Sequence, residues 1–272
     1  FGEPFMKMRH QGMILGPDGK KMSKSKGNVI NPDEVIEKFG ADCLRMYEMF
    51  MGPIESDKPW NVTAVMGVYR FLQRLESTFE AELSAVNEGR SADEQTQALV
   101  RQKLHNTLER ISTNIPALKF NTAIASMMEL LNDWEAARRA SGEVGIFTLE
   151  ELSLVARMIA PFAPFLAEEL WLVLPEAHRV GQRRGGEQLL SVHLSEWPMF
   201  DSELAKPAVS IIPIQINGKV RARLTVAQDL LTEHTVILEQ ALAHPDVQKH
   251  LAGKTVKKQL YIAGKIVSIA TE

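Results

Sequence analysis

Apolar side chains recur every three or four positions through the middle of this chain, from about residue 62 to residue 174. In the first two helices that this pattern predicts, the positions are Val65, Val68, Tyr69, Leu72, Leu75, Leu99, Leu104, Leu108 and Ile111. A spacing of three and four places such side chains on one face of a helix. Long amphipathic helices joined by short links bury these faces against one another, so the pattern predicts a helix bundle.

Two further helical segments follow, over residues 121–142 and 148–174. The second contains Pro161 and Pro164, which lack a backbone N–H and clash with the preceding turn. We therefore expect that segment to be kinked or split in two. Residues 175–190 are polar and rich in glycine, which indicates an exposed loop.

The pattern changes after about residue 208. Two runs rich in β-branched residues flank Asn217-Gly218, the dipeptide most typical of a tight β-hairpin. Residues 232–253 have helical character, with Thr232 as the expected N-cap. A second pair of strands is expected to turn at residues 263–265. Residues 208–272 are thus predicted to form a small β-β-α-α-β-β domain.

The composition restricts the possible functions. The net charge of the 272 residues is −3, so the chain as a whole is no polybasic nucleic-acid binder. Residues 208–272 nevertheless hold eight Lys/Arg against five Asp/Glu, so RNA binding would be local to such regions. The one cysteine, Cys43, excludes an intrachain disulfide and fits a reducing, cytoplasmic setting. No zinc-site spacing and no apolar run long enough for a membrane span are present.

One short stretch is strongly basic: residues 18–34 read DGKKMSKSKGNVINPDE. Its four lysines are Lys20, Lys21, Lys24 and Lys26. A lysine-rich run is most often a solvated surface loop, and that interpretation stays open. Gly27, the two interleaved serines and a helix start at Asn31-Pro32 favour a loop that clamps a polyphosphate. The spacing of a Walker loop is absent.

The five residues Lys21-Met22-Ser23-Lys24-Ser25 spell KMSKS and resemble the signature loop of class I aminoacyl-tRNA synthetases. The longer string KMSKSKGNVINPDEVIEKFGAD resembles the leucyl, valyl and isoleucyl branch of that class. Residues 10–28, 47–61, 214–226 and 251–270 resemble the leucyl enzymes in particular. A valyl or isoleucyl enzyme, or a free-standing tRNA-binding module that kept the loop, remains the alternative.

The resemblance implies a mainly α fold followed by a small α+β domain. Residues 1–30 would be the end of the catalytic domain with the KMSKS loop, and residues 31–61 the stem-contact region. Residues 62–207 would be the helix-bundle tRNA-binding domain, anticodon-binding-like in fold, and residues 208–272 a small C-terminal tRNA-binding domain.

The resemblance also implies the chemistry. Leucyl enzymes activate leucine with ATP, accompanied by Mg²⁺, and transfer it to tRNA(Leu). Lys24 would bind the triphosphate and stabilise the transition state, with Lys21 in support; Met22, Ser23 and Ser25 complete the ATP-binding loop. No protein metal site and no permanent cofactor are expected. The chain starts at Phe1 and has no HIGH-type sequence, so we expect the C-terminal part of a monomeric enzyme, inactive alone.

Seven basic residues are candidates for contact with tRNA: Lys219, Arg221, Arg223, Lys254, Lys257, Lys258 and Lys265. Alternation along a strand predicts that Lys219, Arg221 and Arg223 share one face. Three cations on one face suit phosphate contact. For each residue taken alone, a solvated outer face of the sheet is an equally good interpretation.

Overall fold

The computed structural model describes residue 2 and residues 4–179, 183–184, 187–188, 191–206, 209–252 and 254–272. The chain divides into two compact units, Phe1–Ala205 and Lys206–Glu272, and each has its own hydrophobic core. The boundary expected between residues 207 and 208 lies outside the described residues, as does part of the loop expected at 175–190. Among the described residues, no helix is long and apolar enough to cross a membrane.

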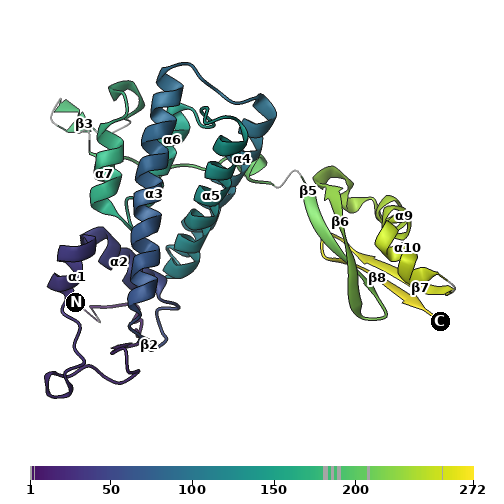
Figure 1. The fold of residues 1–272 in the computed structure, drawn as a ribbon, viewed down its shortest axis with the longest axis horizontal. Helices are drawn as coiled ribbons and strands as arrows, with labels where there is room; N and C mark the ends of the chain where they lie inside the picture. Colours follow the sequence, from purple (N-terminus) through teal and green to yellow (C-terminus); the bar gives the residue numbers. More distant parts are fainter. Residues whose placement is uncertain are drawn as a thin grey trace. The chain divides into compact units, whose positions relative to one another are not determined.

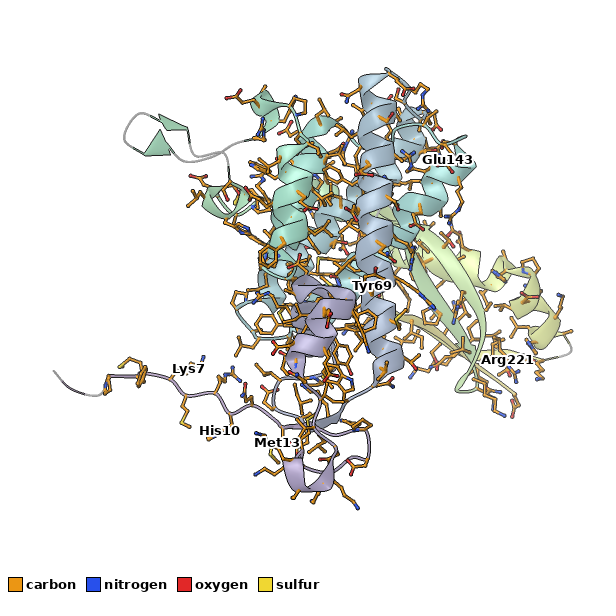
Figure 2. The ribbon with its side chains drawn as sticks, turned by 60° about the vertical axis from the view of Figure 1, so that its left-hand side comes forward. Lys7, His10, Met13, Tyr69, Glu143 and Arg221 are labelled. Carbon is orange, nitrogen blue, oxygen red and sulfur yellow. The ribbon has the colours of Figure 1, made fainter. Side chains whose placement is uncertain are left out.

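The first unit begins with a small strand–helix–helix–strand module. Strand β1 (Ile14–Leu15) pairs in parallel with β2 (Lys58–Pro59). Between them lie the 3-10 turn η1 (Lys24–Lys26), helix α1 (Pro32–Phe39) and helix α2 (Ala41–Phe50). As the sequence predicts, α1 starts at a proline, and the side chain of Asn31 accepts a hydrogen bond from the Asp33 N–H. Lys7 and His10 lie on the extended segment that precedes the module (Figure 2).

Helix α2 ties this module to the rest of the unit from both of its ends. Near its start, the Asp42 carboxylate accepts hydrogen bonds from the N–H groups of Phe165 and Leu166. Near its end, the Tyr47 hydroxyl accepts a hydrogen bond of 2.8 Å from the Asn61 N–H. Cys43, on the same helix, is fully buried, and burial raises the pKa of its thiol to about 11.

The predicted bundle is present, and α3 runs along its length (Figure 1). Its helices are α3 (Val62–Asn87), α4 (Glu94–Asn114), α5 (Phe120–Ala140), α6 (Leu149–Ile159) and α7 (Pro164–Leu172). Pro161 and Pro164 split the last segment into α6 and α7, as expected. Shorter elements follow: η2 (Glu176–His178), β3 (Arg183–Arg184), β4 (Glu187–Gln188), η3 (Val192–Leu194) and α8 (Ser202–Ala205).

A buried carboxylate holds the loop between α5 and α6. Glu82 on α3 is fully buried and accepts hydrogen bonds from Trp134 Nε1 at 3.0 Å and Arg138 Nη1 at 2.6 Å. It also accepts the backbone N–H groups of Ile146 and Phe147. A buried charge is tolerated only when it is paired and its lone pairs are used, and these four donors meet that condition.

The chain that follows the bundle is fastened to α4. The Asp201 N–H donates to His105 Nδ1 at 3.0 Å, and Trp197 Nε1 donates to the Ser112 hydroxyl at 2.8 Å. His105 is buried, and its burial lowers the pKa of the imidazole. The hydrogen bond requires an unprotonated Nδ1, so the same neutral form is favoured twice.

The second unit contains a four-stranded mixed sheet with the strand order β6-β5-β8-β7. Along the chain, apart from one 3-10 turn, its elements follow the predicted order β-β-α-α-β-β. The elements are β5 (Val209–Ile216), β6 (Lys219–Ala227), η4 (Gln228–Thr232), α9 (His234–Ala243), α10 (Pro245–Leu251), β7 (Val256–Ile262) and β8 (Ile266–Thr271). Asn217 (φ 50°) and Gly218 (φ 79°) form the expected hairpin turn. The prediction for Thr232 is wrong: it ends η4, and Glu233 holds the N-cap position of α9.

Both helices of this unit lie on one side of the sheet (Figure 1). Side chains from the two helices and from all four strands form its core: Ile212, Ile214, Ile216, Ala222, Val226, Ile237, Ala241, Val247, Tyr261, Val267 and Ile269. The alternate positions of the strands point away from this core. The second unit therefore has one covered face and one open face.

Candidate functional sites

The lysine loop is a tight turn that exposes its charges. Residues Lys24–Lys26 form one 3-10 turn, and Gly27 ends it with φ 65°. Lys20, Lys21, Lys24 and Lys26 are all exposed. Within the described part of the chain, no carboxylate forms an ion pair with any of these four. Free ammonium groups on a short loop suit an anionic ligand with several charges.

The base of the loop is closed by two polar side chains that the sequence analysis did not single out. Asn28 donates from Nδ2 to the Asp18 carboxylate at 3.1 and 3.3 Å, and its Oδ1 accepts the Ser23 N–H at 2.9 Å. The hydrogen bond from Asn28 holds the pKa of Asp18 below its usual range, aided by the Lys20 N–H. Ser23 and Ser25 share a hydroxyl–hydroxyl hydrogen bond of 3.1 Å.

A pocket of about 620 Å³ adjoins the loop. It is lined by Gln11, Gly12, Met13, Ile14, Lys21, Met22, Glu48, Met49, Gly52, Ile54, Lys58, Leu118 and Phe120. Met13 lies where the extended segment meets the body of the unit (Figure 2). The pocket joins two residues of the KMSKS sequence to α2, β2 and the loop before α5.

Two ionisable residues in this pocket were missed by the sequence analysis. Burial lowers the pKa of the Lys58 ammonium and raises the pKa of the Glu48 carboxyl. Both shifts weaken the charged form, which is the usual effect of a site partly removed from water. Residue spacing gives no signal for either, because Lys58 and Glu48 line the same pocket only when β2 pairs with β1 beside α2.

The candidate RNA-binding residues of the second unit lie near both edges of the sheet. A bulge inserts one extra residue in β6, so that Ile214 pairs with Ala222 but Gln215 pairs with Val220. Lys219 then pairs with the buried Ile216. The predicted single face is therefore wrong for Lys219, because a bulge interrupts the alternation of side chains.

Arg221 and Arg223 remain on the open face. Both are exposed, and Arg223 pairs with Pro213 across from the covered side. Gln215 on β5 and Ser268 on β8 lie on the same face, where Gln215 Nε2 donates a hydrogen bond of 2.9 Å to the Ser268 hydroxyl. Arg221 lies close to the β5–β6 hairpin (Figure 2).

The other four candidates lie on or beside β7 and β8, at the far side of the sheet. Lys258 is exposed and pairs with Ala270, on the open face. Lys257 forms an ion pair of 2.7 Å with Glu272, and Lys254 and Lys265 lie in connecting segments. Because β6 and β7 are the outer strands, roughly 14 Å separates the two basic groups. The structure thus brings Arg221 and Arg223 together but not all seven.

Apolar side chains accompany these charges. Val220, Leu260 and Ile262 are each about half exposed, at 56%, 49% and 46%. Leu260 pairs with Ser268 and Ile262 with Ile266, so both belong to the open face. A face with cations at two edges and apolar groups beside them can take phosphates and sugar or base surfaces together.

Comparison with known proteins identifies the family. Residues 97–237 match the anticodon-binding domain of tRNA ligases, and residues 2–61 match the class I tRNA synthetases for Ile, Leu, Met and Val. The chain therefore belongs to the family of class I tRNA ligases that carry this anticodon-binding domain. Within that family it corresponds to the C-terminal portion of the leucine–tRNA ligases.

Two curated relatives and one solved structure show how far the similarity extends. The chain is 42% identical to the leucine–tRNA ligase of Sorangium cellulosum over 98% of its own length, and 37% identical to that of Deinococcus radiodurans over 99%. It spans 28% and 31% of these relatives. It also superimposes, with a TM-score of 0.77 and 26% identity, on 33% of the Agrobacterium radiobacter K84 agnB2 LeuRS, whose crystal structure is a ternary complex with tRNA and LeuAMS.

These comparisons confirm the resemblance, the mainly helical fold and the leucyl assignment drawn from the sequence. Among the described residues, no group of three or more His, Cys, Asp or Glu side chains could hold a metal ion.

Proposed function

We propose that this chain supplies the ATP-binding loop and the tRNA-binding domains of a leucine–tRNA ligase. The observation that carries the proposal is the KMSKS loop, whose lysines are exposed and form no ion pair with a described carboxylate. In the proposed reaction the leucine carboxylate attacks the α-phosphate of ATP, leucyl-adenylate forms, and pyrophosphate leaves. The leucyl group then passes to the 3′-terminal ribose of tRNA(Leu). The enzyme would be cytoplasmic and monomeric.

The loop would act on the leaving group. Negative charge builds on the β- and γ-phosphates as the bond to the α-phosphate breaks, and fixed cations stabilise that charge. Lys24 takes this role in the proposal and Lys21 supports it from the rim of the pocket. Met22, Ser23 and Ser25 contribute contacts of the loop with ATP. Magnesium would be held by phosphate oxygens and water.

Two lysines of the loop allow a matched test. In the full-length ligase, Lys24→Ala should lower kcat for ATP–pyrophosphate exchange by about a hundredfold or more, because it removes a contact made most strongly in the transition state. Lys26→Ala removes an equally exposed charge outside the KMSKS sequence and should cost less than about fivefold. Equal losses in the two variants would reduce the loop to a general electrostatic effect and contradict the specific role of Lys24.

The second unit would bind tRNA by its open face. The support is the pair Arg221 and Arg223, the exposed apolar residues beside it, and the tRNA in the complex of the Agrobacterium relative. Lys258 would contact the RNA from the other edge of the sheet. Lys219, Lys254, Lys257 and Lys265 would add phosphate contacts around the rim of the face.

Salt dependence tests this interface. Replacing Arg221 and Arg223 by alanine should weaken tRNA(Leu) binding and reduce the slope of log K against log salt by about two, one for each lost phosphate contact. Lys249→Ala is the control, since Lys249 lies on α10 and pairs with Asp246 at 2.8 Å. An unchanged slope in the double variant would remove these arginines from the interface while leaving the role of the loop untouched.

A further inference from the structure

The KMSKS loop is anchored by one side chain that uses both ends of its amide. Asn28 Oδ1 accepts the Ser23 N–H at 2.9 Å, while Nδ2 donates to Asp18 Oδ1 at 3.1 Å and to the Lys21 carbonyl at 3.4 Å. These partners lie five, ten and seven residues earlier in the chain. Asn28 therefore joins Asp18, Lys21 and Ser23 in one hydrogen-bond network.

Asp18 is the carboxylate nearest in sequence to the four lysines, yet it forms an ion pair with none of them. Its Oδ1 accepts the Lys20 N–H at 3.1 Å as well as the bond from Asn28. Those hydrogen bonds satisfy the charge, and they lower the pKa of Asp18. The carboxylate is held mainly by amide donors, and among the described residues no carboxylate forms an ion pair with Lys21, Lys24 or Lys26.

Gly16 packs directly against this pair. A Cβ at residue 16 would lie 2.8 Å from Asp18 Oδ1 and 3.0 Å from Asn28 Nδ2. The Gly16 N–H also donates a hydrogen bond of 2.8 Å to the Lys20 carbonyl. A Cβ at residue 16 would therefore have to displace the Asp18 carboxylate and the Asn28 amide from their present positions.

We propose that Asn28 and Asp18 form a clasp that positions the KMSKS loop, holding Lys21 and Lys24 in the arrangement that meets the ATP triphosphate. Both are positioning residues, since they act through the lysines. The inference rests on the proposed function of the loop. It adds that the geometry of the loop depends on an amide–carboxylate pair outside the five signature residues.

Exchange of the two side chains tests the clasp in the full-length ligase. Asn28→Asp keeps the acceptor for the Ser23 N–H but sets two carboxylates against each other, so kcat for ATP–pyrophosphate exchange should fall by about tenfold or more. The double variant Asp18→Asn/Asn28→Asp restores one amide and one carboxylate with their positions exchanged. It should recover activity to within about threefold of the unmodified enzyme.

Two further variants separate positioning from general effects. Gly16→Ala displaces the clasp without changing any charge and should lower kcat in the same direction. Asn31→Asp is the matched control, because it adds the same charge three residues later and keeps the cap of α1.

The outcomes distinguish this proposal from the proposed function. If the unmodified enzyme catalyses exchange and Lys24→Ala abolishes it, the function of the loop stands whatever happens at Asn28. An Asn28→Asp enzyme with normal kcat would then overturn the clasp. So would a double variant whose loss equals the product of the two single losses, because no exchange of partners would have taken place.

Discussion

Two of the carboxylates in the first unit, Glu82 and Asp18, each hold a loop, and they do so in opposite surroundings. Glu82 is fully buried and joins α3 to Trp134, Arg138 and the backbone of the loop before α6. Asp18 is exposed, and its hydrogen-bond partners among the described residues are the Asn28 amide and the Lys20 N–H. The same kind of hydrogen bond therefore serves two purposes.

The two carboxylates differ in the free energy that is lost when their hydrogen bonds are broken. At Glu82, loss of the carboxylate removes the buried counter-charge of Arg138 and leaves the Trp134 N–H without its acceptor away from water, which is expensive. At Asp18, water replaces any bond that is lost. A buried carboxylate can thus stabilise the whole fold, whereas an exposed carboxylate can stabilise only the local conformation of its own loop, which remains accessible to a ligand.

The largest effect is expected at Glu82. Glu82→Ala should lower the free energy of unfolding by about 3–5 kcal/mol, because the buried Arg138 keeps only the exposed Glu143 carboxylate, 3.5 Å from its Nη2, as a counter-charge. Denaturant unfolding followed by tryptophan fluorescence measures this loss. Glu129→Ala is the control: Glu129 is 63% exposed and its partner Arg110 is 39% exposed, so the loss should be about 1 kcal/mol or less. Similar losses in both variants would erase the contrast between buried and exposed carboxylates.

A half-way case is Asp42, which caps α7 from a different helix. Asp42→Ala removes the acceptor for the Leu166 N–H, which lies 2.8 Å from Oδ2, and should cost about 1–2 kcal/mol. Asp42→Asn keeps one acceptor oxygen and should recover roughly half of that loss. A cost as large as that of Glu82→Ala would mean that burial does not govern the ranking.

His105 gives a smaller effect that depends on pH. Burial lowers the pKa of the folded imidazole, so the unfolded chain takes up the proton first. The contribution of neutral His105 to stability is full above the unfolded pKa of about 6.5 and is lost as the pH falls toward the folded value. Urea midpoints between about pH 7.5 and 5 should fall less in His105→Gln than in the unmodified protein. Parallel pH curves would contradict this.

The smallest effect on stability is expected at Asp18. Asp18→Asn should leave the unfolding midpoint unchanged, because the side chain is exposed and water can satisfy the groups that it leaves. Its effect should be seen only in kcat for ATP–pyrophosphate exchange. A clear drop in the midpoint would place Asp18 with Glu82 as a determinant of the fold.

The sequence predicted the elements that depend on local patterns. The 3.6-residue period gave the helices, Pro161 and Pro164 the break between α6 and α7, and Asn217-Gly218 the hairpin. Each of these signals resides in the residues that form the element, so no knowledge of distant partners is needed.

Features that depend on pairing between distant residues were missed. The bulge that moves Lys219 to the other side of the sheet follows from the register of two strands and has no signature in composition. Thr232 has the side chain of a typical N-cap, but it is the last residue of the 3-10 turn η4, and Glu233 holds the N-cap position of α9. Lys58 and Glu48 enter one pocket only through the pairing of β1 with β2, and Asn28 finds Asp18 across the closed loop.

Helix α2 has a mechanical consequence. It is a single rigid strut of ten residues, roughly 15 Å long. One end, at Glu48 and Met49, forms a wall of the pocket beside the KMSKS loop, and the other end, at Asp42, holds the first turn of α7. One continuous helix therefore connects the pocket beside the KMSKS loop to the bundle helix α7.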